Sequence, residues 1–229
     1  MRIDVKGTIV SDSDAWIYEW FGIECCAPKK INDVLAKSNG QPVDVYVNSG
    51  GGSIFAGSEI YSALRSYSGK VNIHIVGLAA SAASVIACAG HSDISPTAMV
   101  MVHNVSSAGA AGDYHTQDKE SEILKKANET IAAAYVEKTG MSLQDALEMM
   151  DHETWLSAED AVKAKLVDKI AESAQQTLVA AYGCPVLPAE VIEKMRNTIK
   201  PLESGLANAD PDFLMAKIKI LNLRERTLE

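Results

Sequence analysis

Two strand-like runs, each followed by glycine and other small residues, place the strongest constraint on how this chain can fold. Residues 43–47 (VDVYV) lead into NSGGGSIFAG, and residues 71–76 (VNIHIV) lead through Gly77 into LAASAASVIACAG. Three glycines in a loop leave backbone N–H groups free to face an oxyanion. Ser81 follows the second run at a tight strand-to-helix turn, where a helix N-terminus stabilises negative charge. The pattern therefore predicts a serine nucleophile beside an anion-binding loop.

Strand and helix patterns alternate along most of the chain. Residues 2–9 alternate like a strand, residues 31–38 favour a helix, and residues 98–102 form a further apolar strand. Residues 54–67 carry apolar side chains at the spacing of an amphipathic helix. Such repetition is typical of a parallel sheet covered by helices, so we predict an α/β fold.

A long helix is predicted over residues 115–138, because one face is apolar and the other is charged. The apolar stripe comprises Ile123, Leu124, Ala127, Ile131, Ala134 and Tyr135. Further along, Ser142 and Ser157 each precede an aspartate by three residues, which is the pattern of a capping box. Beyond these helices the chain breaks into short apolar pieces punctuated by proline. We therefore predict a chemistry-bearing domain over residues 1–173 and a docking or linker segment over residues 174–229.

Composition argues against several classes of function. The net charge is −9 and no basic run occurs, which argues against nucleic-acid binding. The four cysteines show neither metal-ligand spacing nor a disulfide framework, and we expect reduced thiols in a cytoplasmic protein without a metal. An apolar signal core is absent from the N-terminal sequence, so no secretion is expected. No P-loop ending occurs, and no cofactor is predicted.

A membrane span over residues 71–90 is the one alternative that needs weighing. This segment carries no formal charge and is long enough to cross a bilayer. It is nevertheless rich in small residues, contains Asn72 and His74, and is interrupted by Gly77. Its modest hydrophobicity argues against a membrane span.

Four motifs in this order resemble those of the ClpP family of serine peptidases. NSGGG is similar to the family's NSPGG segment, with Gly50 in place of the proline. GLAASAAS at 77–84 resembles the nucleophile segment, and MVHN at 101–104 resembles the MIH motif. WLSAEDAVKAKLVD at 155–168 resembles the late FLSA-to-GLVD segment. The resemblance covers roughly residues 9–171. It implies a spiral of stacked β-β-α units, shared with the crotonases, from which the long helix projects.

Position by position, the resemblance implies a catalytic site. Ser81 would be the nucleophile, whereas Ser84, one turn later, is interpreted as a packing or hydrogen-bonding residue. His103 would be the general base toward Ser81 and then the general acid toward the leaving amine. Among the five histidines, it alone matches the MIH position. The backbone N–H groups of Gly52 and Ala82 match the family's two oxyanion donors.

The acid of the triad departs from the family pattern. In the family an aspartate lies two residues before the aromatic of the FLSA segment, and here that position holds Glu153. A glutamate can orient an imidazole as an aspartate does, with one more methylene of reach. Asp151 is the alternative if the loop follows a different path.

The resemblance implies a serine endopeptidase that cleaves a protein or peptide substrate as a homo-oligomeric ring, with ring-to-ring contacts made by the long helix. No ATPase module is present in the chain, so energy-dependent unfolding would require a separate ATPase partner. The N-terminus and tail resemble those of phage and prophage ClpP-like head-maturation proteases more than those of the housekeeping subunit, and this resemblance implies a capsid or scaffold protein as substrate. The alternatives are a crotonase-like acyl-CoA enzyme and a catalytically silent assembly protein of the same fold.

Overall fold

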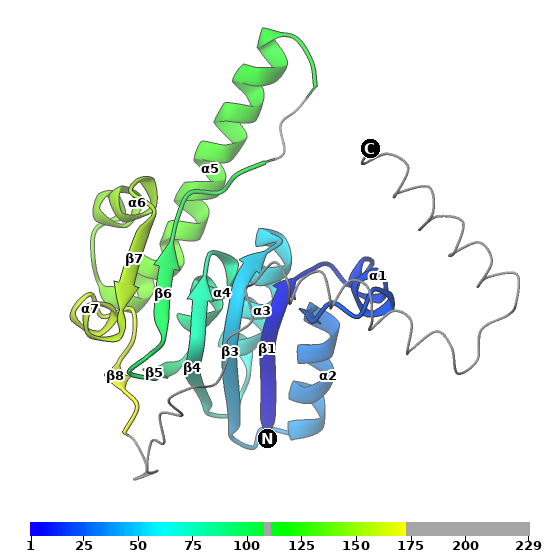
Figure 1. The fold of residues 1–229 in the computed structure, drawn as a ribbon, viewed down its shortest axis with the longest axis vertical. Coiled ribbons are helices and arrows are strands. Elements are labelled where there is room, and N and C mark those ends of the chain that lie inside the picture. Colours follow the sequence, from blue (N-terminus) through cyan, green and yellow to red (C-terminus); the bar gives the residue numbers. More distant parts are fainter. Residues whose placement is uncertain (108–110, 173–229) are drawn as a thin grey trace, which may run out of the picture. The chain divides into compact units, whose positions relative to one another are not determined.

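The computed structural model describes residues 1–107 and 111–172, which form an α/β fold around one sheet (Figure 1). The chain divides into two units, Met1–Gln176 and Thr177–Glu229, and the first contains every residue described below. The docking or linker segment predicted over residues 174–229 lies outside the described residues.

The described elements alternate between strands and helices, as the sequence predicted. The first part of the chain forms β1 (Arg2–Ile9), α1 (Ala15–Trp20), β2 (Cys25–Cys26), α2 (Pro28–Ser38), β3 (Val43–Gly52), α3 (Ile54–Ser66), β4 (Val71–Ala80) and α4 (Ala82–Ala87). It continues with β5 (His91–Ile94), β6 (Met99–Val102), α5 (Tyr114–Thr139), α6 (Leu143–Asp151), β7 (Thr154–Ser157), α7 (Ala158–Lys163) and β8 (Lys169–Ile170).

Pairing in the sheet is almost entirely parallel, which confirms the predicted fold class. The main path runs β2-β1-β3-β4-β5-β8, and β6 pairs with β4 outside this path. Strand β4 pairs with two neighbours on the same side. Its residues 72–75 pair with β5, and its residues 78–80 pair with β6. The single antiparallel pair in the described sheet joins β6 to β7. The sheet therefore divides along β4, and β6 and β7 extend from its carboxyl half.

Both strands that lead into the small-residue segments run further than predicted. Strand β3 continues through the glycines, because Gly51 and Gly52 pair with Thr8 and Ile9 of β1. The expectation of a free glycine loop is therefore wrong in this respect. A Cβ at Gly52 would lie 2.1 Å from the carbonyl oxygen of Ile9, and the φ of Gly52 is +146°. Only glycine permits such a close approach in this backbone conformation.

The small-residue segment forms the buried helix α4 rather than a membrane span. Every residue of α4 is buried. A Cβ at Gly57 of α3 would lie 2.9 Å from the Cβ of Ala82, so small side chains are needed where α3 and α4 meet. A helix buried on all sides is apolar all round, which explains the charge-free run. Within residues 1–107 and 111–172, no helix is long and apolar enough to cross a membrane.

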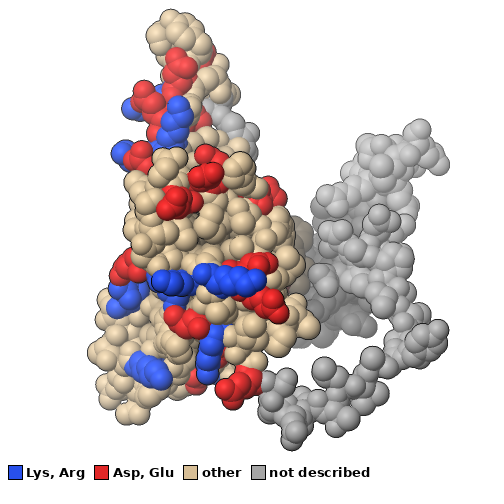
Figure 2. Space-filling model, turned by 90° about the vertical axis from the view of Figure 1, so that its left-hand side faces the viewer, with Lys and Arg blue, Asp and Glu red and all other residues tan. Residues whose placement is uncertain are grey.

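As far as the described residues show, the buried positions of helix α5 all lie in its second half. Its buried residues are Ile131, Ala132, Ala134 and Tyr135, whereas Ile123 is 51% exposed. The first half extends beyond the sheet, as Figure 1 shows. The predicted apolar stripe is therefore covered at one end only. On the face drawn in Figure 2, the upper part of α5 carries interspersed acidic and basic side chains.

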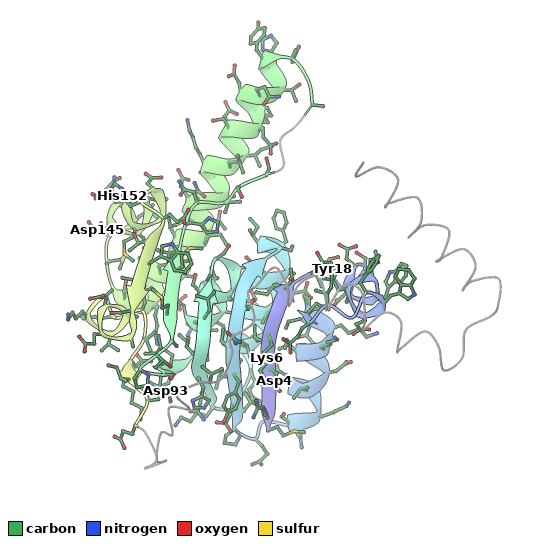
Figure 3. The ribbon with its side chains drawn as sticks, in the orientation of Figure 1. Asp4, Lys6, Tyr18, Asp93, Asp145 and His152 are labelled. Carbon is green, nitrogen blue, oxygen red and sulfur yellow. The ribbon has the colours of Figure 1, made fainter. Side chains whose placement is uncertain are left out.

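Both predicted capping patterns begin helices. At the start of α6, the Ser142 hydroxyl accepts from the Asp145 N–H, and the Asp145 carboxylate accepts from the Ser142 N–H. Figure 3 labels Asp145 at this helix. Ser157 accepts from the N–H of Asp160 at the start of α7. These caps satisfy N–H groups that have no partner within the helix.

A half-buried ion pair fixes the end of α5. The Lys138 ammonium lies 2.6 Å from the Asp168 carboxylate and also donates to the carbonyl of Gly90 at 2.9 Å. The side chain of Lys138 is 9% exposed, and that of Asp168 is 34% exposed. Burial acts to raise the pKa of Asp168, but Lys138 and the Ser92 N–H outweigh it, so the pKa lies below its ordinary value of 3.8.

We expect Lys138→Met to lower the free energy of unfolding by about 2 kcal/mol, because the half-buried carboxylate of Asp168 loses the buried cation that lies 2.6 Å from it. Since the folded pKa of Asp168 is depressed, this stabilisation is present above the ordinary value and lost as the pH falls through the folded pKa. Urea unfolding at neutral pH measures the loss. Lys126→Met is the matched control, because its pair with Glu129 lies on the exposed surface of the same helix. Equal losses in both variants would contradict the prediction.

Candidate active site

The candidate site lies where neighbouring parallel strands end. Ser81 directly follows β4, and His103 directly follows β6. Ala80 pairs with Met101, and the N–H of Ser81 continues the ladder by donating to the carbonyl of Met101 at 3.0 Å. Because parallel strands end at the same edge of a sheet, the pairing of β4 with β6 places the serine and the histidine side by side.

Ser81 and His103 are in direct contact. The Nε2 atom of His103 lies 2.8 Å from the Oγ of Ser81, which is hydrogen-bonding distance. Ser81 has φ 56° and ψ −126°, a conformation that L-residues rarely adopt. Such backbone strain costs about 1–3 kcal/mol and persists only when the surroundings hold it. A sharp, strained turn after a strand exposes a nucleophilic hydroxyl at the edge of the sheet.

The other four histidines lie elsewhere in the described fold. His74 pairs with Asp93 through its Nδ1 atom, and His91 pairs with Asp168. His115 stacks on Tyr114 at the start of α5. His152 follows α6, as Figure 3 shows, with a side chain that is 75% exposed. In the described structure, only His103 hydrogen-bonds to a serine hydroxyl.

The two glycines at the end of β3 differ in what they do. The N–H of Gly51 donates to the Oγ of Ser49 at 3.0 Å, so this donor is already used. A Cβ at Gly51 would lie 2.6 Å from the Cβ of Ser81, so this glycine lets the serine turn come close. Gly52 and Ala82, the predicted oxyanion donors, both line the same pocket as Ser81.

This pocket is the space in which a substrate can meet the serine. Its lining includes Ser81, His103, Gly52 and Ala82. The remaining walls are mostly apolar and comprise Ile54, Val85, Asn104, Val105, Ser106, Ile131 and Tyr135. Apolar walls exclude water and strengthen the electrostatic interactions inside a site.

Neither candidate acid hydrogen-bonds to His103 in the described structure. The Glu153 carboxylate accepts from the indole N–H of Trp155 at 3.2 Å, and the Asp151 carboxylate accepts from the side chain of Asn104 at 2.6 Å. Strand β7 pairs with β6 in antiparallel register, with Thr154 opposite Val102. Glu153 directly precedes β7 in a turn with φ +45°, and His103 directly follows β6.

A thiol nucleophile and a metal centre find no support among the described residues. Burial raises the pKa of Cys26 and of Cys88 to about 12, so both remain protonated at neutral pH. Cys25 is a free thiol that hydrogen-bonds to a backbone carbonyl. In the described ranges no group of three or more His, Cys, Asp or Glu side chains could hold a metal ion.

A serine–imidazole pair beside a glycine-rich strand end, at one edge of a parallel sheet, is an arrangement suited to nucleophilic attack on a carbonyl group, as in serine hydrolases. The chain belongs to the Clp protease family, whose family model matches residues 30–174. Membership of this family confirms the expected ClpP-like fold and class of enzyme.

Similar proteins carry the same family name. The chain is 34% identical to ATP-dependent Clp protease proteolytic subunit 1 of Chlamydia muridarum over 148 residues, which covers 63% of this chain and 77% of that protein. It is 33% identical to the protein of the same name from Salinibacter ruber over 140 residues, which covers 59% of each. The corresponding protein of Chlamydia trachomatis serovar D is 32% identical over 148 residues, covering 63% of this chain and 77% of that protein.

Part of the pocket escaped the sequence analysis. Tyr135 was assigned to an apolar stripe, but it also lines the pocket and bonds to Ser84 of α4. Val105 lies in the pocket because its N–H donates to the side chain of Asn128 on α5. These contacts join segments far apart in the chain, and no local sequence pattern reveals them.

Proposed function

We propose that this protein is a serine endopeptidase in which Ser81 is the nucleophile and His103 the general base. The 2.8 Å contact between Ser81 Oγ and His103 Nε2, on a strained turn within a pocket, carries the proposal. Gly52 and Ala82 are the proposed oxyanion donors. Glu153 is the proposed acid, in preference to Asp151, because it holds the position of the family's aspartate, two residues before Trp155, and directly precedes the strand paired with β6.

The reaction follows from these positions. His103 takes the proton of Ser81 as Oγ attacks the carbonyl carbon of the scissile bond. The N–H groups of Gly52 and Ala82 stabilise the oxyanion that forms. His103 then donates the proton to the leaving amine, and water hydrolyses the acyl-enzyme by the same route in reverse. The carboxylate of Glu153 would orient the imidazole and stabilise its charged form.

The substrate and the assembly form the finer part of the proposal. We propose a capsid or scaffold protein, processed during phage or prophage head maturation in the cytoplasm, because the N-terminus and tail of this sequence resemble those of that branch. The exposed side chain of Ile123, on the first half of α5, supports a homo-oligomeric ring in which another subunit covers this part of the stripe. A separate ATPase partner would supply unfolded substrate.

Labelling with a fluorophosphonate tests the proposed nucleophile. We expect intact-mass spectrometry to show one adduct on the wild type and none on Ser81→Ala, because only an activated serine reacts. Ser66→Ala serves as the control and should keep the adduct, since its hydroxyl bonds to carbonyls of its own helix and does not line the pocket. A wild type that remains unlabelled while folded and oligomeric would overturn the assignment.

The choice between the two acids yields a separate prediction. We expect Glu153→Gln to lower kcat about 10- to 100-fold, less than a buried triad acid, because an exposed carboxylate acts through a higher dielectric. Asp151→Asn should change kcat by less than about threefold, since Asp151 bonds to Asn104 rather than to His103. Peptide hydrolysis measured across pH compares the variants. The reverse ranking would assign the role to Asp151.

A further inference from the structure

A chain of buried hydroxyl groups links α5 to the peptide unit that follows the nucleophile. The Oγ of Ser84 lies 2.6 Å from the carbonyl oxygen of Ser81 and 2.8 Å from the hydroxyl of Tyr135. Ser84 is 1% exposed and Tyr135 is 2% exposed. Both hydroxyl groups are therefore shielded from bulk water.

The direction of donation in this chain is determined by its chemistry. A carbonyl oxygen can only accept, so the single proton of the Ser84 hydroxyl is donated to Ser81. The phenol of Tyr135 must then be the donor toward Ser84. Burial raises the pKa of Tyr135, so the phenol keeps its proton. The order is Tyr135 to Ser84 to Ser81.

Holding the carbonyl of Ser81 also holds the N–H of Ala82. Both belong to one planar peptide unit, in which the C=O and N–H bonds point in opposite directions. The Ser81 carbonyl also accepts from the N–H groups of Ser84 at 2.9 Å and Val85 at 3.4 Å. The bond from the Ser84 hydroxyl is the shortest of the three. Its loss would leave the peptide unit held by the two longer bonds.

We propose that Ser84 and Tyr135 are positioning residues that aim the Ala82 N–H at the developing oxyanion. They also help to hold Ser81 in its strained conformation. This inference rests on the proposed function, because it requires Ser81 as the nucleophile and Ala82 as an oxyanion donor.

Kinetics of two variants test the proposal. We expect kcat to fall about 10-fold in Ser84→Ala and about 3- to 10-fold in Tyr135→Phe, with KM unchanged, since outright loss of an oxyanion donor costs about 10²- to 10³-fold. Tyr61→Phe is the matched control. The Tyr61 hydroxyl bonds at 2.9 Å to Glu137, which lies on α5 as Tyr135 does, and it does not contact Ser81. It should keep the wild-type kcat.

Inhibitor binding separates positioning from a general loss of structure. A peptide boronic acid forms a tetrahedral adduct with the serine and places an oxygen where the oxyanion develops. Its Ki should rise by the same factor by which kcat falls, whereas the Ki of a product peptide should stay constant. A merely structural role would weaken both inhibitors together and would overturn the proposal.

Other results of these experiments would overturn the inference alone or the proposed function with it. Wild-type kcat in Ser84→Ala and Tyr135→Phe, with Ser81 of the wild type labelled by fluorophosphonate, would overturn this inference alone. A loss in Tyr61→Phe equal to that in Tyr135→Phe would also overturn it. An unlabelled wild type would overturn the proposed function, and the inference with it. Should Ser84→Ala fail to fold, Tyr135→Phe, which loses a single hydroxyl, decides the matter.

Discussion

Replacing Ser81 with alanine is expected to lower kcat by about 10⁴- to 10⁶-fold, because no other described hydroxyl is held against an imidazole. His103→Ala should cause a loss of similar size. The serine is a weak nucleophile unless a base removes its proton as it attacks. Peptide hydrolysis, followed over hours at high enzyme concentration, measures the residual rate.

The double variant provides the sharper comparison. Residues that act as one unit lose nearly all of their effect when either is removed, so Ser81→Ala combined with His103→Ala should be no slower than either single variant. Losses that multiply would show that the two side chains act independently. That result would contradict the pairing seen at 2.8 Å.

Gly51→Ala is expected to lower kcat by about 10²- to 10³-fold, comparable with the loss of an oxyanion donor. Its Cβ would lie 2.6 Å from the Cβ of Ser81 and 2.8 Å from the carbonyl of Ala80, and the φ of Gly51 is +95°. The strand end or the serine turn must therefore shift, and a misplacement of about 1 Å can cost about 10²-fold in rate.

Gly50→Ala is the matched control for this prediction. A Cβ there would meet nothing within 4 Å, and Gly50 does not have a left-handed φ. We expect its kcat to stay near that of the wild type. Thermal melting of both variants separates a displaced site from an unfolded one. Equal activity of the two alanine variants would show that close packing of Gly51 on the serine turn is not needed for catalysis.

The serine, the histidine and the glycine-rich segment could be located from the sequence because each lies where an apolar run ends. Parallel strands bring such ends to one edge, so the order of motifs was enough to predict their proximity. The extent of the strands could not be predicted. Gly51 and Gly52 pair with β1, a partner more than forty residues earlier in the chain, and local composition indicates only a loop.

Other features depend on pairing and packing between segments far apart in the chain, which a sequence pattern does not reveal. The position of Glu153 depends on the antiparallel pairing of β6 with β7, which local sequence does not specify. Helix α1 was not predicted. It has no buried residue and its Trp16 is 64% exposed, so its sequence shows no apolar face that repeats with helical spacing. The bond between the Tyr135 hydroxyl and Ser84 depends on the packing of α5 against α4, which the sequence pattern does not specify.

Strand β4 pairs with both β5 and β6, which follow it closely in the chain. This order determines when each residue of the site is synthesised. Residues 71–103 alone contain β4, α4, β5 and β6, and so both members of the serine–histidine pair. The proposed acid, Glu153, follows fifty residues later, directly before β7. During synthesis the pair can therefore come together before Glu153 exists, and a chain halted between these points carries a nucleophile and a base but no acid. On the proposed assignment, full activity would then require the fold to be complete through β7.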